Sequence, residues 1–88
     1  MDLTVETKRY AFIVPCCFDY ITIWLCSELK QNPKQGSYHY LTKKEMRNLI
    51  EYLKQDNYGD GRDSWIIDRL TNTEMLMEGK ETAAIHFW

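Results

Sequence analysis

The sequence of 88 residues predicts a small α+β domain, with a mainly antiparallel sheet of about three strands covered on one face by two to three helices. Three features predict this class: an apolar β-forming run at 9–14, a helical apolar stripe at 43–55 and strict alternation at 82–88. No repeat or linker divides the chain, so residues 1–88 are expected to form one domain.

The first strand is predicted at 9–14, where Pro15 ends a run of aromatic and β-branched residues. The first helix is predicted at 18–31, because Phe18, Ile21, Leu25 and Leu29 recur at helical spacing. A strand over 20–25 stays open as the alternative, since β-branched residues alternate in that stretch.

The second helix is predicted at 43–55 from its start signal and its apolar stripe. Thr42 as N-cap and Glu45 three residues later form a capping box, in which each side chain bonds the other residue's backbone N–H. The apolar residues fall at i, i+3, i+4 and i+7, which places one stripe toward a core: Met46, Leu49, Ile50 and Leu53.

The last third of the chain predicts a short helix followed by a hairpin. Asp63 or Ser64 can cap a third helix at 63–71. Strands at 74–78 and 82–88 are expected to pair through a turn that contains Gly79.

Composition restricts the class of protein. The first residues lack the apolar core of a secretory signal, and no run is long and uncharged enough to span a bilayer, so a cytoplasmic protein is expected, with no membrane contact. Three cysteines, an odd number with Cys16 and Cys17 adjacent, suit reduced thiols. The formal charge is −2 over residues 1–29, +4 over 30–54 and −4 over 55–88, so basic groups concentrate in the middle.

No known catalytic or metal-binding motif has all of its residues in this sequence. Residues 56–67 resemble an EF-hand calcium loop at Asp56, Asp60 and Gly61, but Tyr58 and Ile67 occupy positions that need oxygen ligands. Three cysteines and two histidines have no paired spacing, so a zinc site is not expected. Cys16 and Cys17 lie at the predicted start of a helix, where a thiol can be reactive. A cysteine-dependent enzyme that uses Cys16 or Cys17 therefore remains one alternative. No metal or cofactor is predicted.

The candidate binding residues surround the start of the second helix. Two lysines in its first turn oppose the positive end of the helix dipole, and a bound anion would remove this conflict. Aromatic residues nearby are of the kind that interfaces prefer. The predicted partner- or anion-binding residues are Tyr38, His39, Tyr40, Lys43, Lys44, Arg47 and Trp88.

Without an acid/base pair, metal set or phosphate loop, the sequence favours a non-enzymatic protein that binds a larger macromolecule stoichiometrically. An inhibitor or adaptor of a protein partner, of the kind that phages and mobile elements encode, is the first hypothesis. A nucleic-acid or nucleotide binder that uses the basic helix start is the second, and the cysteine-dependent enzyme is the third. A homodimer is possible, because a small core gains from further burial.

Overall fold

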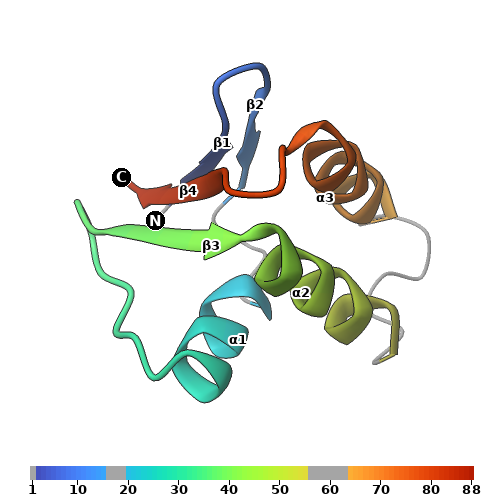
Figure 1. Ribbon diagram of the computed structural model, residues 1–88. Helices are drawn as coiled ribbons and strands as arrows, with labels where there is room; N and C mark the ends of the chain where they lie inside the picture. The colour runs from blue at the N-terminus through green and yellow to red at the C-terminus, as the bar shows by residue number, and fades with distance from the viewer. Residues whose placement is uncertain (1, 16–19, 56–63) are drawn as a thin grey trace.

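The computed structural model describes residues 2–15, 20–55 and 64–88, which form one four-stranded sheet and three helices (Figure 1). All strand pairs are antiparallel, and the strand order is β2-β1-β4-β3. The α+β class is confirmed, with four strands instead of about three. In chain order the elements are β1 (Leu3–Glu6), β2 (Ala11–Val14), α1 (Tyr20–Glu28), β3 (Tyr38–Thr42), α2 (Lys43–Gln55), α3 (Ser64–Leu76) and β4 (Thr82–Phe87).

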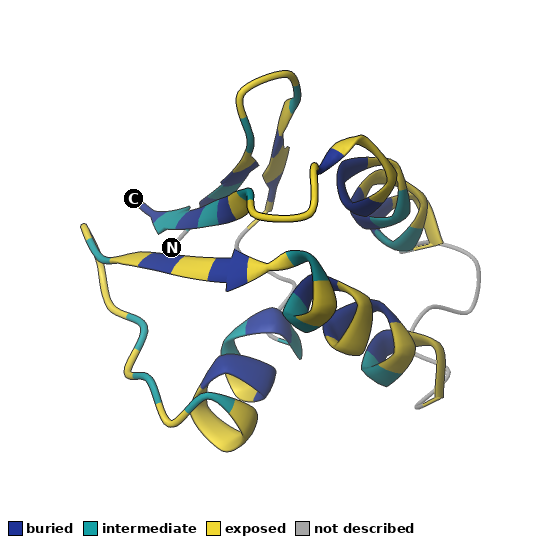
Figure 2. Ribbon diagram, viewed as in Figure 1, coloured by how far each residue is buried: buried dark blue, intermediate teal, exposed yellow. Residues whose placement is uncertain are grey.

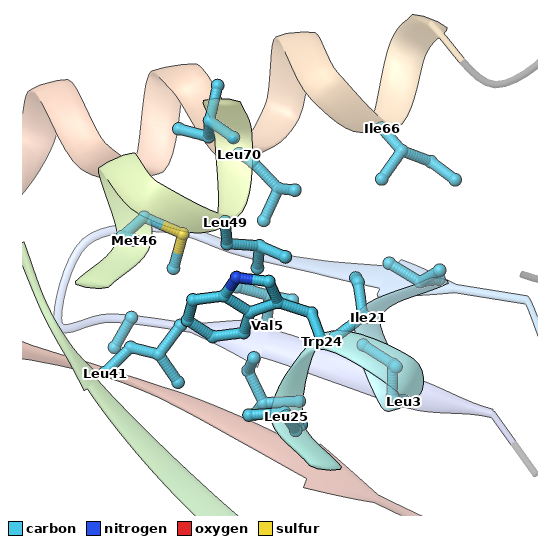
Figure 3. Packing of buried hydrophobic residues seen from close by; sticks show 14 of the residues in the cluster. Leu3, Val5, Ile21, Trp24, Leu25, Leu41, Met46, Leu49, Ile66 and Leu70 are labelled. Carbon is cyan, nitrogen blue, oxygen red and sulfur yellow. The ribbon is translucent and has the colours of Figure 1, made fainter. Parts of the chain in front are cut away.

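The core lies between the sheet and the helices, which all cover the same face (Figures 1 and 2). Strand side chains alternate between the two faces, so every second strand residue is buried. Figure 3 shows side chains from all three helices gathered around Trp24 of α1 and the core-facing strand residues Leu3, Val5 and Leu41. Within residues 2–15, 20–55 and 64–88, no helix lies on the opposite face of the sheet.

Helix α1 confirms the helical interpretation of residues 20–25 over the strand alternative. The helix ends at Glu28, and Lys30 then adopts a left-handed backbone with φ of 54°. The amide of Gln31 donates to the carbonyl of Leu25 at 3.1 Å, a helix-ending bond that a left-handed residue makes possible. The chain therefore turns before Pro33, and the predicted end at residue 31 is slightly late.

Helix α2 has the predicted bounds and the predicted capping box. Thr42 N–H donates to Glu45 Oε1 at 2.9 Å, and Glu45 N–H donates to Thr42 Oγ1 at 3.2 Å. The four stripe residues that the sequence analysis places in the core are all buried. Because Thr42 is also the last residue of β3, strand and helix join without a loop.

Helix α3 corrects the predicted strand at 74–78, because the helix continues to Leu76. Ile66, Leu70, Thr73 and Met77 are buried at helical spacing, and this stripe outweighs the local β-propensity of the segment. Thr71 and Thr73 donate their hydroxyls to carbonyls four residues earlier, which suits a continuing helix. In the described parts of the chain, no helix has the length and apolar character needed to cross a membrane.

Strand β4 is central, which also corrects the predicted hairpin. Its alternation of buried residues is as predicted, but it pairs with β1 on one side and β3 on the other. Strands β1 and β3 have no counterpart among the elements predicted from the sequence. Both segments have only four or five residues, so local patterns give weak signals for them. β3 pairs only with β4, which lies far away in sequence, and β1 pairs with β4 as well as with nearby β2.

Candidate functional site

The candidate site is the helix-free face of the sheet, here called the open face. The register places successive rows of residues side by side across the four strands. One row contains Ile13, Thr4, His86 and Tyr38, and the next contains Ala11, Glu6, Ala84 and Tyr40. Trp88 follows β4 on the same side.

Large apolar side chains of the open face are half exposed to solvent. The exposed fraction is 55% for Ile13, 51% for Tyr38, 58% for Tyr40 and 47% for Trp88. Four such side chains on one side of one sheet are a concentration that single scattered surface residues do not give. The open face is therefore the side of the described sheet on which large exposed apolar side chains gather.

Ring contacts hold the aromatic residues in fixed positions. The rings of Tyr38 and His86 stack with centroids 4.0 Å apart and planes 3° apart, and Tyr38 also lies 6.4 Å from Tyr40. The indole N–H of Trp88 donates to Thr4 Oγ1 at 2.7 Å. Because the side chains are ordered before any ligand arrives, binding on this face would cost little side-chain entropy.

Charge on the open face is sparse and not basic. Glu6 is exposed within the face, and the cations Lys8 and Arg9 lie in the turn that follows β1. Arg9 is already paired, since its guanidinium lies 2.8 Å from the Glu78 carboxylate. The middle of the face is therefore aromatic, with one acidic group inside it.

A polar hollow of about 460 Å³ adjoins the turn between β1 and β2. The Glu81 carboxylate accepts hydrogen bonds there from the N–H groups of Glu78 and Lys8, at 3.1 and 3.3 Å. These bonds, the Glu78 bond first, together with the charges of Lys8 and Arg9, lower the pKa of Glu81. Charged residues of both signs line the hollow and contact one another. These contacts connect the turn between β1 and β2 to the turn that precedes β4.

The predicted binding residue His39 lies on the other side of β3. Only 6% of His39 is exposed, and the rings of His39 and Phe87 form a T-shaped pair with centroids 5.6 Å apart. Its Nδ1 contacts the side-chain amide of Gln31, and its Nε2 lies 2.9 Å from Ser37 Oγ. Burial lowers the pKa of His39 below 6.5.

Two of the three predicted cations on α2 make contacts within the fold. The Lys43 ammonium donates to the carbonyl of Met77 at 2.9 Å, directly after the C-terminus of α3. Its charge, which is unfavourable at the start of α2, is thus favourable at the negative end of α3. Arg47 pairs with Glu74 of α3 at 2.6 Å. Lys44 is exposed and has no partner among the described residues.

The predicted set of binding residues is therefore divided between two places. Tyr38, Tyr40 and Trp88 share the open face, whereas His39 is buried and the cations lie on α2. The capping box also occupies amide groups at the start of α2 that the predicted anion would need. Sequence reasoning missed Ile13, Thr4 and His86 as members of the site, because only the strand register brings them beside the tyrosines.

Comparison of the chain with protein-family models, curated proteins and solved structures found no match. Within residues 2–15, 20–55 and 64–88, no group of three or more His, Cys, Asp or Glu side chains is arranged to hold a metal. The pair Cys16 and Cys17 and residues 56–63 of the loop that resembles a calcium site lie outside the described residues. The open face is thus the candidate site on geometry alone.

Proposed function

We propose that this protein binds a protein partner stoichiometrically through the open face, as an inhibitor or adaptor does. The observation that carries the proposal is a sheet with helices on one face only and four half-exposed apolar side chains on the other. Burial of such side chains against a partner releases water at about 25 cal/mol per Å² of apolar area. Aromatic side chains held in place are typical of the residues that dominate protein interfaces.

The charge of the open face favours a protein over a nucleic acid as the partner. Phosphate contacts from Lys and Arg supply most of the non-specific affinity for nucleic acids. The open face instead carries Glu6, and the basic residues Lys43 and Arg47 lie on α2 with partners of their own. The stacked rings of Tyr38 and His86 also leave less free ring face for bases.

Site-specific photo-crosslinking in cells tests this proposal. A photoreactive phenylalanine analogue is placed at Ile13 or Trp88 on the open face, and at Met75 of α3 as the matched control, since Met75 is also exposed and apolar. We expect both open-face positions to form a covalent adduct with the same protein in a one-to-one ratio. Nuclease treatment should leave this adduct unchanged.

The variant Ile13→Glu supplies the second arm, because it adds a charge to the open face at a side chain that is half exposed. We expect it to reduce the crosslink from Trp88 at least tenfold while the far-UV spectrum is unchanged. Equal yields from Met75 and the open face, or an adduct that disappears with nuclease, would contradict a protein-binding open face.

A further inference from the structure

We propose that β3 is a docking edge for a second copy of this chain, so that two sheets join through antiparallel pairing of β3 with β3. Strand β3 ends the sheet order and has a neighbour on one side only. In Figure 1 it lies at the near edge of the sheet, with no other element drawn in front of it. This inference concerns the strand edge, and it does not depend on what binds the open face.

The hydrogen-bond alternation identifies the groups that point outward from β3. Phe87 N–H donates to Ser37 O at 3.0 Å and Phe87 O accepts from Gly36 N–H at 2.7 Å, so Gly36 and Ser37 together bond to Phe87 in a bulge at the start of β3. In an antiparallel ladder hydrogen-bonded pairs alternate, which makes His39 and Leu41 the next residues bonded to β4. The N–H and C=O groups of Tyr38 and Tyr40 therefore face away from β4, and no hydrogen bond occupies them in the described part of the chain.

The capping box of α2 selects one register for the pairing. Thr42 N–H is used by Glu45 Oε1, so Thr42 cannot act as a donor to a new strand. The remaining outward donors are the N–H groups of Tyr38 and Tyr40. The register that uses both of them places Tyr38 opposite Tyr40 of the second copy, with His39 on the two-fold axis. Each Tyr38 and Tyr40 pair then exchanges two N–H···O bonds, which gives four in total.

The same register brings aromatic side chains together across the junction. Tyr38 and Tyr40 both point to the open face, so each tyrosine meets a tyrosine of the other copy. Opposed aromatic pairs stabilise antiparallel strands. Exposed edge strands are normally protected by charge or proline, and Tyr38–Thr42 contains neither. The other edge, β2, would present Ala11 and Ile13, which offer no aromatic pair, and Pro15 follows it.

Sedimentation equilibrium of the full chain over a wide range of concentration tests the pairing. We expect the mass to approach twice that of one chain, and Tyr40→Pro to raise the dimer dissociation constant at least tenfold. Proline removes the outward N–H and is tolerated on an edge strand. Ile13→Pro is the matched control, because it removes the corresponding outward N–H on β2 and should leave the dimer intact. Tyr40→Lys, which keeps the backbone donor, supplies a second test should the proline variant unfold.

Isotope-filtered NMR on a mixed sample of labelled and unlabelled chains tests the register. We expect intermolecular contacts between the rings of Tyr38 and Tyr40. A chain that stays monomeric at every concentration, a dimer unaffected by Tyr40→Pro and Tyr40→Lys, or one that Ile13→Pro dissociates would overturn the inference. Because the crosslinking positions Ile13 and Trp88 lie off β3, failure of this pairing leaves the proposed function intact, and the reverse also holds.

Discussion

Arg47 of α2 binds the carboxylate of Glu74 of α3 through two nitrogens, Nε at 3.0 Å and one terminal nitrogen at 2.6 Å from the same oxygen. The Glu74 side chain is 11% exposed, whereas that of Arg47 is 66% exposed. A nearly buried carboxylate is thus neutralised by a largely exposed cation of the neighbouring helix. This pair joins the basic middle of the chain to its acidic last third.

Removal of the cation should therefore destabilise the fold. Arg47→Ala leaves the Glu74 carboxylate desolvated without its partner, and we expect the free energy of unfolding to fall by about 1–3 kcal/mol. Urea denaturation measures this change. In the double variant with Glu74→Leu, the loss should be smaller than the sum of the two single losses, as for directly coupled residues. Additive losses would contradict a stabilising pair.

Lys43 and Lys44 are adjacent lysines with different contacts, which makes them a matched comparison. Lys43→Ala removes the bond to Met77 O and a positive charge at the end of α3, and should cost about 1 kcal/mol. Lys44→Ala removes an exposed side chain and should change the free energy of unfolding by less than about 0.5 kcal/mol. Thermal denaturation of both variants measures the difference, and equal effects would show that the Lys43 contact contributes nothing.

His39 should make stability depend on pH. Its pKa is lower in the folded chain than the usual 6.5, so the unfolded chain binds the proton more tightly. The contribution of neutral His39 is fully present above pH 6.5 and is lost as the pH falls through that value toward the lowered pKa, with a slope of at most about 1.4 kcal/mol per pH unit. Urea denaturation of the wild type and His39→Gln at several pH values isolates this term. Parallel pH profiles of the wild type and His39→Gln would contradict a contribution from His39. His86 is present in both proteins, so it does not account for a difference between them.

Lys30→Gly should stabilise the protein. Lys30 is the one non-glycine residue with a positive φ in the described parts of the chain, and glycine adopts this backbone without a Cβ penalty. We expect the free energy of unfolding to rise by roughly 0.5–1 kcal/mol. Lys34→Gly, in the same loop but without a positive φ, is the control and should not stabilise. A rise in both variants would point to a loss of positive charge as the cause.

The sequence predicted those elements whose signals are local. Helix α2 has its start encoded by Thr42 and Glu45 and its buried side by a 3.6-residue period, and both are confirmed. The alternation in residues 82–88 likewise predicted a strand, which β4 confirms. For α3 the local β-propensity near Met75 favours a strand, although the helical stripe from Ile66 to Met77 that the structure buries is present in the sequence.

The site could be predicted only in part, because its members meet through pairing between distant segments. By itself the sequence determined an α+β domain with aromatic residues at Tyr38, Tyr40 and Trp88. Only the tertiary structure decided that β4 is central, that β3 is an edge and that Lys43 and Arg47 turn toward α3. The physical reason is that a helix forms from contacts three and four residues apart, whereas strand register depends on partners up to 84 residues away, as for Leu3 and Phe87.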